Sequence, residues 1–176
     1  YFTTLLERSE PALHGKEQFV ILRELNADFE NLRTAWDWAL EQRHVQQIVA
    51  ALDGMAALYS ASGRIIEGSD ALQRARTILG AASIDPLSLV QALLHETVFC
   101  RMIGQGAKAQ PLFEGALEIL KAQEQAGKEI RALKAIALWR LADHLWYSDV
   151  QHSQTVLKES LAICTSINNH WAEGEI

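Results

Sequence analysis

The chain has 176 residues, of which 49% are hydrophobic and 22% are charged, with three prolines and ten glycines. This composition excludes a disordered chain, and the scarcity of turn residues favours long helices over many short strands. The formal net charge is −6, and the lysines and arginines are scattered rather than clustered. We therefore expect no direct nucleic-acid contact by this segment and no membrane association.

The two cysteines, Cys100 and Cys164, lie far apart among apolar neighbours. Their spacing fits neither a disulfide framework nor a CxxC site, so we interpret both as buried reduced thiols and expect a cytoplasmic protein. The chain begins at Tyr1 without a methionine and ends at Ile176 inside an expected helix. We therefore expect it to be a piece of a longer protein.

Residues 1–43 predict an N-terminal helical linker or cap. Tyr1 to Glu10 predicts a short helix, and residues 16–43 predict either one long helix or two, with Asn26 or Asp28 as the internal cap. Within this region large apolar side chains recur every three or four positions and share one helix face. They are Leu22, Leu25, Phe29, Leu32, Trp36 and Ala39. A lone helix cannot bury such a face, so we expect it to pack on the helices that follow.

Residues 44–176 predict repeated pairs of helices. The first pair covers about 45–80, the second 87–122 and the third 128–167, and a fourth begins near residue 170. The turn positions Gly63, Gly104 and Ser148 are 41 and 44 residues apart. Each second helix then shows a small, a large and a small residue at the same spacing: Gly68, Leu72, Ala75; Ala109, Phe113, Ala116; Ser153, Leu157, Ser160. Small residues let helices approach closely, so the predicted fold class is all-α, an α–α superhelix or solenoid of antiparallel helix pairs.

This small-large-small pattern resembles the tetratricopeptide repeat, which also has a small residue on its first helix. Ala56 and Thr97 match that position, whereas Leu141 departs from it. The family's closing proline is absent, and the periods exceed the usual length of about 34 residues. The resemblance implies a tetratricopeptide-like fold with longer helices.

The front of the chain is similar to the segment that follows the nucleotide-binding module in bacterial STAND signalling ATPases, which include regulators related to the maltose-regulon activator. The similarity covers about residues 5–80, and two runs carry it: Glu30-Asn31-Leu32-Arg33 with Ala35 and Trp38-Ala39-Leu40, and Tyr59 to Arg64 with Glu67-Gly68. It implies the sensor region of a multidomain transcriptional regulator, with an ATPase domain upstream and adjacent domains of the same chain as partners.

No motif for catalysis is recognisable. The run Gly104 to Ala109 lacks the GK[ST] arrangement of a phosphate-binding loop, and His95-Glu96 lacks a second histidine because Phe99 stands in its place. Polar residues near one helix junction are interpreted as surface residues rather than a site: His144, Asp149 and His152. We therefore expect no enzyme activity, no metal and no cofactor in this segment.

A binding groove is the expected site. In tetratricopeptide proteins the first helices line the concave face, and counting from the aligned small residues places five residues near it: Asp53, Gln91, Arg101, Leu138 and Trp146. The charged and amide side chains would fix a polar group of a protein partner, a peptide or a small-molecule inducer. A merely solvated face is the alternative. Trp139 and Trp146, seven residues apart, predict either an aromatic wall of this groove or core packing.

Two functions stay open from the sequence. In the first, the chain senses an inducer or partner, and binding shifts the balance between the off and on states of an attached ATPase. In the second, it is a constitutive protein–protein scaffold or adaptor without an ATPase. An upstream nucleotide-binding loop in the parent chain would distinguish them.

Overall fold

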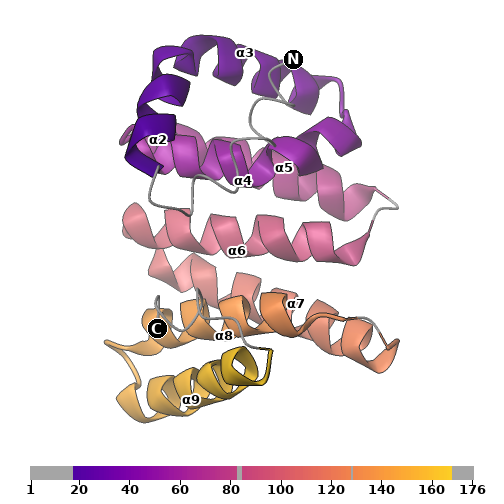
Figure 1. The fold of residues 1–176 in the computed structure, drawn as a ribbon, viewed down its shortest axis with the longest axis vertical. Coiled ribbons are helices and arrows are strands. Elements are labelled where there is room, and N and C mark those ends of the chain that lie inside the picture. Colours follow the sequence, from indigo (N-terminus) through magenta and orange to yellow (C-terminus); the bar gives the residue numbers. More distant parts are fainter. Residues whose placement is uncertain (1–17, 83–84, 128, 168–176) are drawn as a thin grey trace.

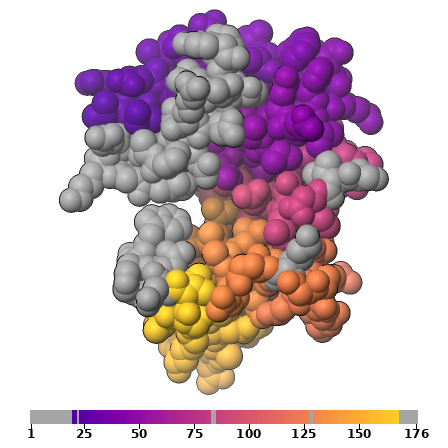
Figure 2. Space-filling model, turned by 45° about the vertical axis from the view of Figure 1, so that its right-hand side comes forward, coloured from indigo at the N-terminus to yellow at the C-terminus, as the bar shows by residue number. Residues whose placement is uncertain are grey.

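The structure is a computed structural model and describes residues 18–82, 85–127 and 129–167. All regular structure in these residues is helical, which confirms the predicted all-α class for this part of the chain. The helices follow one another along the long axis of the molecule (Figures 1 and 2). They are α2 (Gln18–Ala27), α3 (Phe29–Glu41), α4 (Val45–Ala61), α5 (Ile65–Ala81), α6 (Pro86–Met102), α7 (Gly106–Gln125), α8 (Arg131–Leu145) and α9 (Val150–Ser166).

The predicted helices match these elements closely. The three predicted pairs correspond to α4 with α5, α6 with α7, and α8 with α9, and Pro86 stands in the first turn of α6. The open question at residues 16–43 is answered by a break at Asp28, which separates α2 from α3 and occupies the N-cap position of α3. The predicted helices at residues 1–10 and from residue 170 lie outside the described residues.

The apolar face of α2 and α3 is buried, as its spacing predicts. Leu25, Phe29, Leu32, Trp36 and Ala39 are each at most 4% exposed. They pack with residues of α4, α5 and α6 in one hydrophobic cluster, so the N-terminal helices share a core with the first helix pair.

Helix α6 belongs to two hydrophobic clusters at once. Its Ala92 and Phe99 are buried with side chains of α2 to α5, whereas its Val90, Leu94 and Cys100 are buried with side chains of α7 to α9. It therefore joins the two halves of the described core.

The small residues of the second helices are buried against the first helices. Ala109 and Ala116 are fully buried on either side of Phe113. In the third pair serines replace them, and their hydroxyls bond to carbonyl oxygens of α8: Ser153 Oγ donates to Ala142 at 2.7 Å, and Ser160 Oγ donates to Ala135 at 2.8 Å. A serine therefore serves as the small residue at these sites because its buried hydroxyl finds an acceptor on the facing helix.

The turn after α4 depends on a glycine in the left-handed region, Gly63, with φ of 70°. The next amide, Arg64 N–H, donates to the carbonyl of Tyr59 at 3.0 Å, and Gly104 heads an equivalent turn after α6. This six-to-one bond is the Schellman ending of a helix, which favours glycine because no Cβ then meets the backbone.

The turn between α3 and α4 has the same construction without a glycine. Arg43 has a φ of 54°, and the amide of His44 donates to the carbonyl of Ala39 at 2.9 Å. No turn residue in the sequence signals this ending. The left-handed conformation is unfavourable for arginine, so this turn holds Arg43 in a strained backbone conformation.

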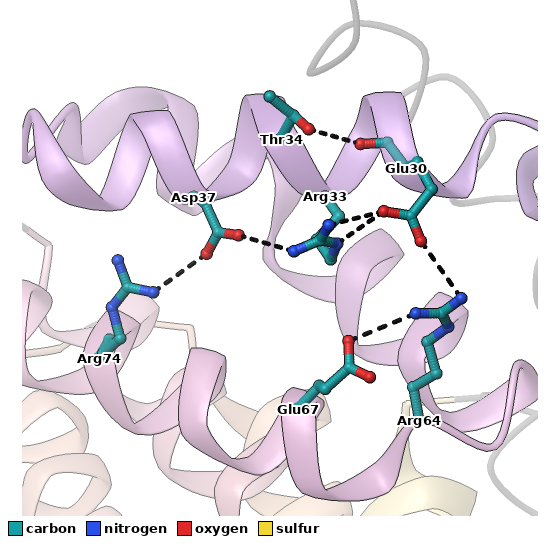
Figure 3. A network of polar contacts seen from close by, with 7 residues as sticks. All are labelled: Glu30, Arg33, Thr34, Asp37, Arg64, Glu67 and Arg74. Atoms are coloured by element: carbon teal, nitrogen blue, oxygen red, sulfur yellow. Dashed lines mark hydrogen bonds and ion pairs between the residues drawn. The ribbon is translucent and has the colours of Figure 1, made fainter.

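An ion-pair network joins α3 to α5 on the surface (Figure 3). Arg64, at the start of α5, lies 3.2 Å from Glu30 and 3.5 Å from Glu67, and Arg74 lies 3.0 Å from Asp37. The Arg64 guanidinium also lies 4.2 Å from the centre of the Phe29 ring. Exposed pairs of this kind each contribute little, so the network orients the two helices more than it stabilises them.

Gly68→Ala is expected to lower the free energy of unfolding by about 1–3 kcal/mol, because an overpacked site must shift its neighbours. A Cβ on Gly68 would lie 2.8 Å from Tyr59 Cβ and closer still to the Phe99 ring. Urea denaturation followed by circular dichroism measures the change. Gly115→Ala on α7 is the matched control, since a Cβ there meets no atom within 4 Å and alanine favours the helix. Equal effects of the two substitutions would contradict the close approach at Gly68.

Arg43→Gly is expected to raise the free energy of unfolding by about 1 kcal/mol, because glycine removes the strain of the left-handed conformation. The comparison is Arg23→Gly, at an exposed position inside α2, which is expected to lower it by about the same amount. Thermal and urea unfolding of both variants test this. A loss of stability in Arg43→Gly would show that the arginine side chain matters more than its backbone conformation.

Candidate functional site

A cavity of about 450 Å³ lies between α4, α6 and α8, the first helices of the three pairs. These helices also touch one another, α4 against α6 and α6 against α8. Residues spaced three or four apart on α4 form one wall: Asp53, Ala56, Ala57 and Ser60. The side chains of α4 are small here, which leaves room between the helices.

The wall of the cavity is mainly apolar. Helix α6 contributes Leu94, Val98 and Phe99, and α8 contributes Leu133, Ile136 and Trp139. The aromatic side chains of Phe99 and Trp139 thus come from two different helices. A molecule that displaces water from such a wall gains hydrophobic stabilisation in proportion to its apolar area.

Three charged or titratable side chains meet at the same cavity, one from each helix: Asp53, His95 and Arg140. His95 Nε2 lies 2.5 Å from Asp53 Oδ1, a contact that joins α6 to α4. Arg140 has no hydrogen bond or ion pair with another described residue. Burial lowers the pKa of the Arg140 guanidinium from its ordinary value, and the charge of Asp53 opposes that shift.

Two of the five predicted groove residues line this cavity, Asp53 and Gln91. The other three do not. Leu138 is only 5% exposed and is buried in the core that α8 shares with α6, α7 and α9. Arg101 pairs with Asp143 outside the cavity, and Trp146 is 47% exposed just beyond the end of α8.

The difference arises from the rotation of α8. Its residues at the cavity are Leu133, Ile136, Trp139 and Arg140. Leu138 stands two positions before Arg140, which is about 200° around a helix, so it points to the core. The second period, 44 residues, is longer than the first, 41 residues. Counting without gaps cannot show where along α8 the extra residues change which side chains face the cavity. Trp139 lines the cavity, as the aromatic-wall interpretation predicts, but Trp146 does not line it.

Sequence reasoning missed His95 and Arg140 as site residues. In the sequence, His95 stands next to Glu96 and suggests only a metal motif. Its partner is Asp53, 42 residues away, whereas Glu96 is buried and pairs with Arg76 of α5. The available signal was the position of His95 four residues after Gln91, which places both on one face of the helix.

Two other side chains with possible reactivity, Cys100 and His144, do not line the cavity. Cys100 is buried, which raises the pKa of its thiol and disfavours the nucleophilic thiolate. His144 packs on Phe113, with ring centres 5.5 Å apart, and burial together with Arg101 lowers its pKa. Within the described residues there is no cluster of three or more potential metal ligands. None of the described helices has the length and apolar character required to cross a membrane.

The residues that carry the resemblance to STAND proteins meet in space. Glu30 and Arg33 of α3 belong to one run and Arg64 and Glu67 to the other, and all four join the surface network between α3 and α5 (Figure 3). Comparison of the chain with protein-family models, curated proteins and solved structures found no match in any of the three. The family assignment therefore remains a prediction from the sequence, and the cavity is the firmest guide to function.

Proposed function

We propose that this chain is a non-catalytic binding domain, a tetratricopeptide-like solenoid whose first helices form the inner face and bind a small molecule in the cavity between α4, α6 and α8. The size of the cavity carries the proposal. Small-molecule sites are typically about 300–1,000 Å³, mainly apolar, with a few polar groups that fix orientation. The cavity, at about 450 Å³ with Asp53, His95 and Arg140 at an apolar wall, has these properties.

The pattern of helix contacts supports the solenoid. Each first helix touches the next first helix, α4 with α6 and α6 with α8. Among the described helices no contact of similar extent joins α5 with α7 or α7 with α9. A stack that is tighter along its first helices bends toward them, which makes their side the concave one.

The resemblance extends the proposal to a regulatory role. In a STAND-type signalling ATPase or transcriptional regulator, this segment would be the sensor, and its ligand would favour one packing of the repeats on the ATPase domain. The α3–α5 network supports this arrangement, because it fixes the linker helix on the first pair (Figure 3). A constitutive scaffold would need an extended contact surface, and a cavity of about 450 Å³ favours a small ligand instead.

The neutral fluorescent probe N-phenylnaphthylamine is expected to bind the protein saturably with a rise in fluorescence, since its emission increases in apolar surroundings. Ala57→Trp fills the cavity from α4 and is expected to abolish this rise, and Val98→Trp is expected to do the same from α6. Ala61→Trp is the matched control, since Ala61 is an exposed residue at the end of α4. Circular dichroism shows whether each variant keeps its helices.

Two outcomes would contradict the cavity as the binding site. Unchanged probe binding in both folded cavity variants would place the probe elsewhere on the molecule. An equal loss in Ala61→Trp would show that the effect does not depend on filling the cavity.

The native gene product is expected to be several times larger than this 176-residue chain, because the proposed sensor requires an ATPase domain in the same polypeptide. An immunoblot of source-cell lysate with antibody against this segment measures the size. A product close to the size of the chain itself would rule out an attached ATPase domain and would favour the adaptor function.

A further inference from the structure

We infer that the ligand of the cavity between α4, α6 and α8 is a small molecule with a flat apolar body and a single carboxylate, and that Arg140 binds this carboxylate. The inference rests on the proposed function, since it names the chemical class of the molecule that the cavity accepts. The carrying observation is the state of Arg140 within the cavity.

Arg140 is a partly buried cation at the cavity, and it has no direct partner among the described residues. Burial lowers the pKa of its guanidinium, and no hydrogen bond or ion pair links it to another described residue. Its nitrogen atoms are not fully buried, so they are accessible to a molecule in the cavity. A charge that is partly removed from water gains from a partner of opposite charge, because burial weakens its solvation. An arginine presents a planar fork of donors that matches a carboxylate with two parallel hydrogen bonds. An anionic group entering the cavity would supply the missing partner.

Asp53 does not fill this role. Its Oδ1 atom contacts His95 Nε2 at 2.5 Å, so the carboxylate is engaged with α6. It acts on Arg140 only as a charge beyond ion-pair distance, which stabilises the guanidinium without satisfying its donors. The same cation disfavours a positively charged ligand, because Arg140 would repel it at the polar end of the cavity.

The rest of the lining selects the body of the ligand. Apart from the three charged or titratable groups, the described lining offers polar atoms only from Ser60, Gln91 and the indole N–H of Trp139. A peptide would need partners for the N–H and C=O groups of each residue, and this wall cannot satisfy them. Phe99 and Trp139 instead provide aromatic surface from two helices, which suits a flat apolar body.

Calorimetric titration with naphthoate and with the uncharged isostere naphthamide tests the inference. The wild-type protein is expected to bind naphthoate about tenfold or more tightly than naphthamide, the gain typical of a charge-assisted hydrogen bond. In Arg140→Met this preference is expected to disappear. Arg101→Met is the matched control, because Arg101 pairs with Asp143 outside the cavity, and it is expected to keep the wild-type preference.

A second measurement separates ligand binding from a structural role. Without ligand, Arg140→Met is expected to unfold at the same temperature as the wild type or higher, since methionine removes a partly buried charge that pairs with none of the described residues. Naphthoate is expected to raise the unfolding temperature of the wild type and not that of the variant. A strongly destabilised Arg140→Met would show that Arg140 supports the fold, and would overturn the inference.

The remaining outcomes distinguish the inference from the function on which it rests. Equal binding of naphthoate and naphthamide by the wild type would contradict the inferred recognition of a carboxylate. It would still be consistent with the apolar cavity as a binding site. Binding of N-phenylnaphthylamine without naphthoate binding would do the same. Failure of all three probes would overturn both the inference and the proposed site.

Discussion

The close approach of Phe99 to Gly68 is the contact on which the described structure most depends. Phe99 lies on α6 and Gly68 on α5, so the contact joins the first helix pair to the second. Phe99 is also buried in the N-terminal core and lines the cavity. Because a glycine lets the ring lie against the backbone of α5, α6 comes close enough to serve two cores and one side of the cavity.

Much of the fold could be predicted because its determinants are local and periodic. The spacing of Leu25, Phe29, Leu32 and Trp36 predicts a buried helix face, and all four are buried. The repeated small residues predict close helix pairs, and Ala109 and Ser153 are buried where expected. The turn at Arg43 could not be predicted, because no glycine or asparagine marks its left-handed position.

The candidate site could be predicted only in part. Asp53 and Gln91 line the cavity, but Leu138 does not, because α8 turns Ile136, Trp139 and Arg140 to the cavity and Leu138 to the core. His95 and Arg140 cannot be identified from a sequence motif, because the residues next to them in space come from other helices. A sequence shows which face of a helix is apolar, but the meeting of polar groups from three helices depends on how those helices are rotated and spaced.

The walls of the cavity come from three successive pairs, which gives its contents a mechanical consequence. Any molecule seated there touches α4, α6 and α8 together, so it sets the distances between pairs rather than the shape of one pair. In a stack where each pair rests mainly on its neighbours, small rotations at successive interfaces add along its length. A change in these distances would therefore displace the N-terminal helices relative to the C-terminal pair.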